Sequence, residues 1–256
     1  MALPSILHFC VHPQRQWQPP NVTRHFLSVR ILAKISSYSA FGAHLAIIGS
    51  ESRLPIWRSL HMLIDFSPVR EGGMKLLAFS KQFTFHDLRL AINAYLDATL
   101  DLLADCDDAM LTHEPHDEGA YDPFAAEAEQ HIGWNLAHLV LHVTASLEEG
   151  AAFCSVLGRG IPLGGRLRYE PDWRAFTTRA QVIARLEECR RICIAYLDTL
   201  PEPPHLDVYR ELPESIAEHF GKLNAPANML LGLRHWDDHI AQMQDAKAQA
   251  QAALKA

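Results

Sequence analysis

The sequence lacks several features that assign a chain quickly to a class of protein. None of its five cysteines forms a CxxC pair. No GxGxxG, GxxxxGK[ST] or GxSxG motif occurs, which removes the motif evidence for a dinucleotide fold, a P-loop or a serine-hydrolase elbow. No stretch shows the convincing alternation of polar and apolar residues that indicates a half-buried strand. These absences favour a helical fold and a site of another kind.

Long apolar runs and an excess of positive charge are also missing. The most apolar N-terminal window, residues 40–50, is too short to span a bilayer. Residues 1–16 lack the order of charge, apolar run and cleavage site that a signal peptide needs. The formal charge of -7 gives no reason to expect nucleic acid or an acidic membrane as a partner. An odd number of unpaired cysteines favours a reducing cytoplasm over a disulfide framework.

The composition changes near Met74. Residues 1–73 carry a net charge of +4, and residues 74–256 carry -11. The first segment also lacks sustained helical periodicity, so we leave it unassigned: it is a small domain, a disordered tail or a stretch that is not natively translated. The codons of 70-REGG-73 would be rich in purines, like a ribosome-binding site, and we hypothesise that Met74 or a nearby codon is the natural start. Mass spectrometry of the native N-terminus tests this.

The spacing of apolar residues from Met74 onward predicts four amphipathic helices. Capping residues at Thr84 and Thr178, and Asn224 followed by a proline, mark three of the starts. The expected helices span about 85–110, 123 or 125 to 157, 179–200 and 225–244, and residues 245–256 are expected to fray into solvent. Four helices of this length predict an all-α fold, a four-helix bundle, whose long connections allow crossovers.

Histidine is what the sequence has in abundance, with fifteen in the chain. Chance alone gives roughly one pair spaced four residues apart. The chain has three such pairs: His8–His12, His138–His142 and His235–His239. A single pair is most simply a solvated or hydrogen-bonded helix face, so spacing alone does not identify a metal site.

Placement strengthens the case for a metal site. His235 and His239 would lie on one side of the last helix, beside its apolar edge, and can point into the bundle. The second helix offers another histidine at the edge of its own apolar face. Facing helices can therefore supply three imidazoles from two elements. Three nitrogen ligands leave coordination positions open, which is typical of a catalytic rather than a structural site.

Two stretches resemble the DinB-like superfamily over residues from about 74 to 256. In 133-GWNLAHLVLHVTASLEEGAAF-153, Trp134 precedes His142 by eight residues, the spacing of that family's second helix. The stretch 230-LLGLRHWDDHIAQM-243 resembles its final helix, which carries HxxxH. The segments 166-RLRYEPDW-173 and 187-EECRR-191 resemble one uncharacterised branch.

This resemblance implies a four-helix bundle in which His142, His235 and His239 bind a divalent metal, with zinc or nickel expected. It also implies a small-molecule substrate, allows a homodimer, and favours a thiol-dependent S-transferase or isomerase that uses a low-molecular-weight thiol. Lewis-acid activation of a thiolate or of water would be the mechanism. A metal-dependent hydrolase and a non-catalytic metal-binding or dimerisation bundle remain alternatives, so enzymatic activity itself stays open.

The neighbours of these histidines allow more than one interpretation. His138 either replaces His142 as a ligand or forms a hydrogen bond to it. Glu149 either orients a ligand, serves as a general base, or is a solvated carboxylate. Asp237 and Asp238 are either exposed or support the paired histidines.

The glycine-rich connection carries Arg166, Arg168 and Arg174, which either receive an anionic substrate near the bundle mouth or form an ordinary basic loop. Trp134 and Trp236 are most simply core residues.

Overall fold

The structure is a computed structural model that describes residues 63–122 and 127–255. This part of the chain is helical and holds no strand, which confirms the all-α prediction. The α-helices are α2 (Ser67–Arg70), α3 (Leu76–Phe79), α4 (Phe85–Leu102), α5 (Asp108–Thr112), α6 (Leu136–Gly158), α7 (Arg179–Asp198), α8 (Glu214–Phe220) and α9 (Ala225–Ala253). Short 3-10 turns lie at η1 (Ser80–Gln82), η2 (Glu127–Glu129) and η3 (Trp173–Ala175).

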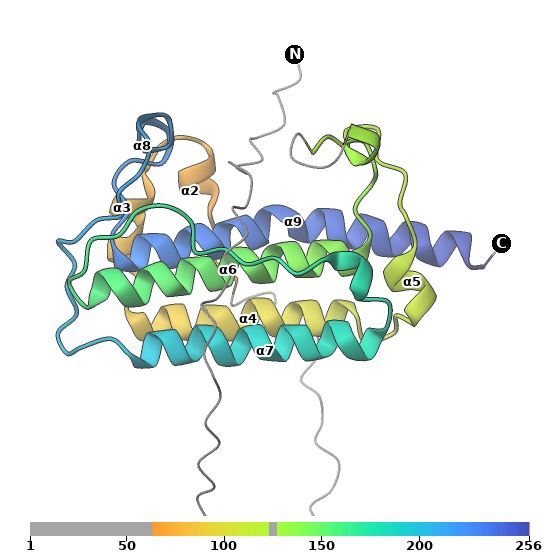
Figure 1. Cartoon of the computed structure of the whole chain (residues 1–256), viewed down its shortest axis with the longest axis horizontal. Coiled ribbons are helices and arrows are strands. Elements are labelled where there is room, and N and C mark those ends of the chain that lie inside the picture. The colour runs from red at the N-terminus through yellow and green to blue at the C-terminus, as the bar shows by residue number, and fades with distance from the viewer. Residues whose placement is uncertain (1–62, 123–126, 256) are drawn as a thin grey trace, which may run out of the picture. The chain divides into compact units, whose positions relative to one another are not determined.

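The four long helices form the predicted bundle (Figure 1). Each packs against two neighbours: α6 contacts α7 and α9, and α4 contacts the same two helices from the opposite corner. The connection between α6 and α7 runs back along the bundle, so these two helices point the same way. This connection, residues 159–178, is the crossover that the long sequence spacers allowed.

The expected helix starts are confirmed by their caps. Thr84 and Asp87 form a reciprocal capping box at the start of α4, and Thr178 and Gln181 form another at α7. The Asn224 side chain accepts a hydrogen bond from the backbone of the first turn of α9. Local sequence therefore determines where these three helices begin.

The first long helix ends earlier than expected. α4 stops at Leu102 instead of near Met110. The Asp107 side chain accepts a hydrogen bond of 2.9 Å from the backbone N–H of Met110 and thereby caps a separate short helix, α5. The acidic turn thus divides what the periodicity predicted as one element.

The second long helix begins later than expected. The predicted start at 123–125 lies outside the described residues, but residues 127–129 form only a 3-10 turn. α6 begins at Leu136, because Asn135 accepts a hydrogen bond of 2.9 Å from the backbone N–H of His138 and acts as its N-cap.

The prediction that the C-terminal tail frays is wrong. α9 continues to Ala253, and both Ala246 and Ala250 are buried. Lys247 donates to the carbonyl oxygen of Leu102 at 2.6 Å, which ties the tail to the end of α4. Polar residues surround these alanines in the sequence, but the alanine side chains are small enough to pack closely against the rest of the bundle.

The apolar core surrounds α6. Within the described part of the chain, α6 is the one helix whose length and composition would allow it to cross a membrane. The protein itself buries 83% of the 18-residue apolar stretch of this helix. Burial on nearly all sides explains its composition, since a helix that is apolar all round packs at the centre of a bundle.

Two glycines bring α6 and α9 into backbone contact. A Cβ added to Gly150 would lie 2.8 Å from the carbonyl oxygen of Asn228, and one added to Gly232 would lie 3.1 Å from the Cα of Leu147. The first distance is shorter than real Cβ contacts, and the second is tight enough that the neighbouring backbone would have to shift slightly. The two helices therefore approach closely along this half of their interface, which fixes their separation for the residues beyond it.

Residues 63–73, part of the segment that the sequence left unassigned, pack onto the bundle. Phe66 is fully buried and its ring lies 5.7 Å from that of Phe79. Arg70 forms ion pairs with Asp237 and Asp238 on α9. Residues 1–62 lie outside the described residues, and both the domain boundary at Met74 and the natural start there stay predictions.

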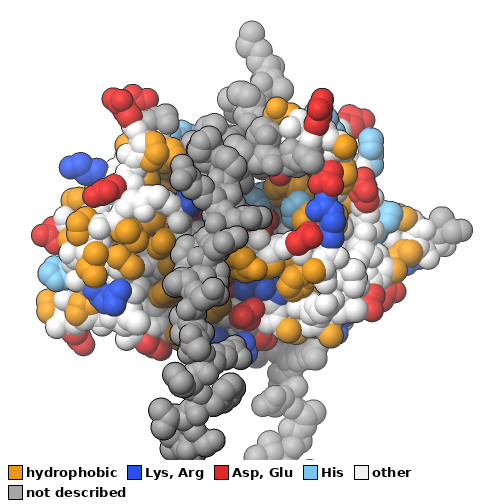
Figure 2. Space-filling model, viewed as in Figure 1, with side chains coloured by type: hydrophobic (Ala, Val, Ile, Leu, Met, Phe, Trp, Pro, Cys, Tyr) orange, Lys and Arg blue, Asp and Glu red, His pale blue; other side chains and the backbone are white. Residues whose placement is uncertain are grey.

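The surface mixes charges of both signs. On the face that Figure 2 draws, Lys and Arg side chains lie scattered among Asp and Glu side chains, with hydrophobic side chains between them. Two of the more exposed hydrophobic residues, Leu167 and Tyr169, belong to the crossover.

Candidate metal centre

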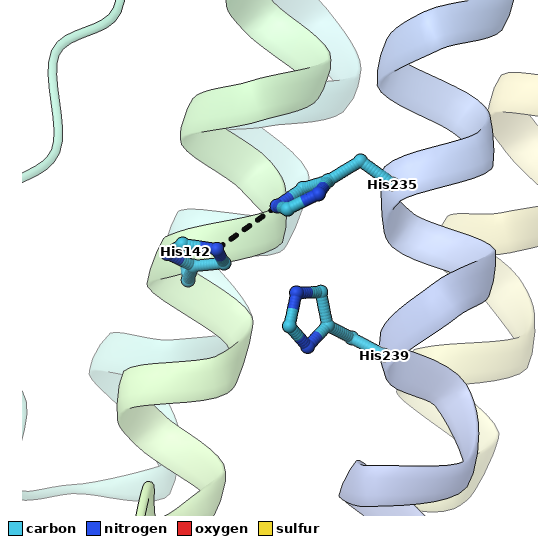
Figure 3. Close-up of side chains that lie close together, drawn as sticks. All are labelled: His142, His235 and His239. Atoms are coloured by element: carbon cyan, nitrogen blue, oxygen red, sulfur yellow. Dashed lines mark hydrogen bonds between the residues drawn. The ribbon is translucent and has the colours of Figure 1, made fainter. Parts of the chain in front are cut away.

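The structure brings together the three histidines that were predicted as ligands. His142 projects from α6, and His235 and His239 project from α9 toward it (Figure 3). One ring nitrogen from each lies within 4.8 Å of the other two, and the Nε2 atoms of His142 and His235 are 2.9 Å apart. His142 and His239 are buried and His235 is half-buried. That they bind a metal stays a prediction, which this convergence supports.

The outward-facing nitrogens of two of these rings have their own partners. Nδ1 of His239 lies 2.8 Å from Oε1 of Gln242, one turn along the same helix. Nδ1 of His142 lies 3.3 Å from Oε1 of Glu170 and 2.8 Å from Nη2 of Arg168. At His239 the acceptor at Nδ1 holds the proton there and leaves Nε2 as the nitrogen that can face a metal, whereas at His142 a carboxylate and a guanidinium compete for Nδ1.

His138 stands outside the cluster, between two aromatic rings. Its ring centroid lies 4.4 Å from that of Trp134 and 4.9 Å from that of Trp173, almost parallel to the latter. Its Nε2 is 4.0 Å from Oε1 of Glu170. Burial, which disfavours the charged form, lowers the pKa of His138 to about 4, so the ring is neutral at physiological pH.

Trp134 also lies beside the cluster itself. Its ring centroid is 4.6 Å from that of His142 and 6.0 Å from that of His239. The tryptophan whose spacing helped to indicate the family is buried, as a core residue would be, and forms one wall of the site.

The crossover arginines are engaged within the protein. Arg168 donates to the Ser146 hydroxyl, to the carbonyl oxygen of His142 at 3.0 Å and to Oε2 of Glu170 at 2.5 Å. Arg174 forms ion pairs with Glu129 and Asp172. Arg168 is therefore part of the site's scaffold, and reception of an anion by these arginines stays a prediction.

The contacts of Glu149 are with the crossover and with Arg210, and not with the histidine cluster. Its Oε1 accepts a hydrogen bond of 3.0 Å from the backbone N–H of Leu167, and it lies 3.6 Å from both Arg166 and Arg210. The carboxylate is also largely buried, so the solvated interpretation does not describe it.

The two aspartates between the paired histidines face away from the cluster. Asp237 accepts a hydrogen bond of 2.8 Å from the hydroxyl of Tyr95 and pairs with Arg70, which also contacts Asp238 at 2.7 Å. Burial, with the nearby carboxylate, raises the pKa of Tyr95, so its hydroxyl stays a donor. These contacts fix the part of α9 that carries the histidines.

Sequence reasoning missed Glu170 and Gln242. Gln242 follows His239 by three residues on a helix, a spacing that places both side chains on one face and was readable from the sequence. Glu170 lies 28 residues from His142 in an irregular connection. No local pattern connects the two, and only the path of the crossover along α6 does so.

The described residues thus form a helical bundle in which three histidines converge from two facing helices, a donor set that could hold a metal ion. Comparison with family models gives a match to the DinB superfamily over residues 91–243, which is more than half of the chain. The chain belongs to the DinB superfamily. Comparisons with curated proteins and with solved structures give no match.

Proposed function

We propose that the protein is a divalent-metal-dependent enzyme in which His142, His235 and His239 hold the ion. The observation that carries this proposal is the convergence of the three imidazoles within 4.8 Å of one another. Zinc–nitrogen bonds of about 2.0–2.1 Å at tetrahedral angles separate ligand nitrogens by roughly 3.4 Å, so small side-chain rotations bring this donor set to bonding geometry. Three neutral nitrogen donors suit zinc or nickel.

A metal held by three protein ligands supplies Lewis-acid activation at its remaining positions. The chain's own residues orient the ligands and shape the approach to them. Trp134 and Trp173 enclose His138 beside the cluster, which limits the access of water on that side. Burial lowers the pKa of His138 to about 4, so its imidazole stays neutral beside the cluster and is a weak base there.

We further propose a thiol-dependent transfer or isomerisation as the reaction, because family resemblance favours it. Within residues 63–255, the cysteines Cys106, Cys154, Cys189 and Cys193 are all buried, and burial raises the pKa values of Cys106, Cys154 and Cys189. The reacting thiol would therefore come from a small molecule. Such a reaction in a reducing compartment agrees with the proposed cytoplasmic location.

Elemental analysis of the purified protein tests the metal proposal first. We expect about one zinc or nickel ion per chain. His142→Ala, His235→Ala and His239→Ala should each lose it, while His86→Ala, a change of an exposed histidine on α4, should keep it. A wild-type protein that is metal-free and binds no ion on titration contradicts the proposal.

A cobalt-substituted sample tests the proposed chemistry. Addition of a low-molecular-weight thiol should change the visible spectrum if the thiol reaches the ion. An unchanged spectrum, together with ester or amide hydrolysis that requires the metal, would instead indicate a hydrolase. A triple His→Ala variant that folds as the wild type does separates both from a bundle whose metal serves only stability.

A further inference from the structure

Glu170 is the residue through which the crossover reaches the histidine cluster. Its Oε1 lies 3.3 Å from Nδ1 of His142, and its Oε2 is held by Arg168. We propose that Glu170 is a positioning residue: it accepts a hydrogen bond from the Nδ1–H of His142 and so presents the Nε2 lone pair to the metal. This inference rests on the proposed three-histidine site and adds to it a residue that no motif assigns.

The need for such a residue follows from the chemistry of imidazole. A neutral ring carries one proton, and only the other nitrogen can bind a metal. Nε2 of His142 faces Nε2 of His235 at 2.9 Å, so Nε2 is the atom directed toward the cluster. The proton of His142 must then sit on Nδ1, where a carboxylate is the strongest acceptor. His239 shows the same arrangement with Gln242 as its acceptor.

Arg168 makes the choice of tautomer depend on Glu170. Its Nη2 lies 2.8 Å from the same Nδ1 of His142. A guanidinium only donates hydrogen bonds, so a ring that accepts from Arg168 carries its proton on Nε2 and cannot bind a metal there. Glu170 and Arg168 therefore favour opposite tautomers of His142, and of these two side chains the carboxylate favours the one that binds metal.

Arg168 also holds the carboxylate in place. The guanidinium is largely buried, and it is anchored by the Ser146 hydroxyl and the carbonyl oxygen of His142. From this position its ion pair with Glu170 fixes the orientation of the acceptor. A charged acceptor held by a buried arginine loses little side-chain entropy when it bonds the histidine.

The crossover that carries Glu170 is itself fixed to the bundle. The backbone N–H of Leu167 donates to Glu149 at 3.0 Å, and Arg210 donates to the carbonyl oxygen of Gly165 at 2.8 Å. They hold the crossover where it runs back along α6 toward His142 (Figure 1). Glu170 thus acts from a supported segment, and the long connection has a role in the site beyond joining two helices.

Two variants and a matched control test the proposal. Glu170→Ala removes the acceptor, and Glu170→Gln keeps its shape without the charge. Asp172→Asn alters an exposed carboxylate two residues along the same segment, which contacts Arg174 instead of a histidine. The dissociation constant for cobalt(II) is measured by competition titration, and long-range proton–nitrogen NMR spectra report the tautomer of His142. Circular dichroism and denaturant unfolding of the metal-free proteins check the fold.

We expect Glu170→Ala to weaken cobalt binding by about 10- to 100-fold and Glu170→Gln by a smaller factor. Asp172→Asn should bind as the wild type does. In the metal-free proteins the Nδ1–H form of His142 should dominate in the wild type and lose population in Glu170→Ala, a change that a purely structural role would not produce.

Two results overturn the inference. The first is a cobalt affinity of Glu170→Ala within threefold of the wild type with an unchanged tautomer. The second is a cobalt spectrum showing that Glu170→Ala has lost a direct oxygen ligand, because Glu170 would then bind the metal itself. Failure of the wild-type protein to bind cobalt is a different result, since it removes the proposed site before any variant is compared.

Discussion

The two halves of the interface between α6 and α9 are built in opposite ways. In one half, Gly150 and Gly232 let the helix backbones touch without intervening side chains. In the other half, three imidazoles fill the space between the same two helices. The first half sets how far apart the helices are, and the second uses that separation to bring nitrogens from both helices to one point.

The halves also differ in how they contribute to stability. Close packing of small residues around the glycines gains dispersion contacts and requires no partner. Burying an imidazole costs the free energy of its hydration, and only hydrogen bonds or a bound ion offset this cost. The histidine half is accordingly surrounded by polar support, with Gln242, Glu170 and Arg168 on the rings and Asp237 bonded to Tyr95. This difference leads to four predictions.

The largest expected effect is stabilisation by metal, which acts on the histidine half alone. At a free zinc concentration about 1,000-fold above Kd, the unfolding free energy of the wild type should rise by about 4 kcal/mol. His235→Ala should show almost none of this rise, whereas His86→Ala should show all of it. Thermal unfolding with and without zinc measures the difference. An equal rise in wild type and His235→Ala would place the bound ion elsewhere.

The second prediction concerns pH and His138. Burial lowers its pKa from 6.5 to about 4 in the folded protein, so between these values the unfolded chain holds more protons. Stability should therefore rise with pH across this window, by roughly 3 kcal/mol in total, and be lost on acidification. His138→Phe, which keeps a ring between the tryptophans, should remove this part of the dependence. Denaturant unfolding of metal-free proteins between pH 4 and 7 measures it, and parallel pH profiles would refute the assignment.

The third prediction breaks the glycine half. Gly150→Ala places a Cβ 2.8 Å from the backbone oxygen of Asn228 and should lower the unfolding free energy by about 2 kcal/mol. It should also weaken metal binding, because a wider helix separation moves His142 away from α9. Gly73→Ala is the control, since its Cβ would make only an ordinary contact. A loss of stability with unchanged metal affinity would show that the two halves are independent.

The smallest effect tests how residues 63–73 support α9. In a double-mutant cycle, Arg70→Gln and Asp237→Asn should show a coupling of at most about 1 kcal/mol, because Arg70 is partly exposed to solvent. Denaturant unfolding of the four proteins gives the coupling energy. A value near zero would mean that the Arg70–Asp237 ion pair adds nothing, and that other contacts, such as the burial of Phe66, hold this segment.

Much of the fold was readable from the sequence because helix caps are local. Thr84, Thr178 and Asn224 marked helix starts, and the structure confirms each. The errors arose where tertiary packing overrides local signals. Ala250 belongs to a tail that looked ready to fray, yet it is fully buried against the bundle.

The site was predictable only in part. Helical spacing placed His235 and His239 on one face, and family resemblance selected His142 over His138. No sequence signal identified Glu170, because its contact with His142 depends on how the crossover lies along α6. Nor did the sequence indicate the role of Gly150 and Gly232. A glycine inside a helix usually lowers stability, and its role in close helix packing is recognised only when the facing backbone is known.

X-ray absorption spectroscopy of the zinc-loaded protein tests the central claim most directly. The account predicts a first shell with three imidazole nitrogens at about 2.0–2.1 Å in the wild type, and no such zinc shell in His142→Ala, which should lose the ion. A shell containing sulfur at about 2.3 Å in the absence of added thiol, or a wild-type spectrum unchanged by His142→Ala, would contradict it.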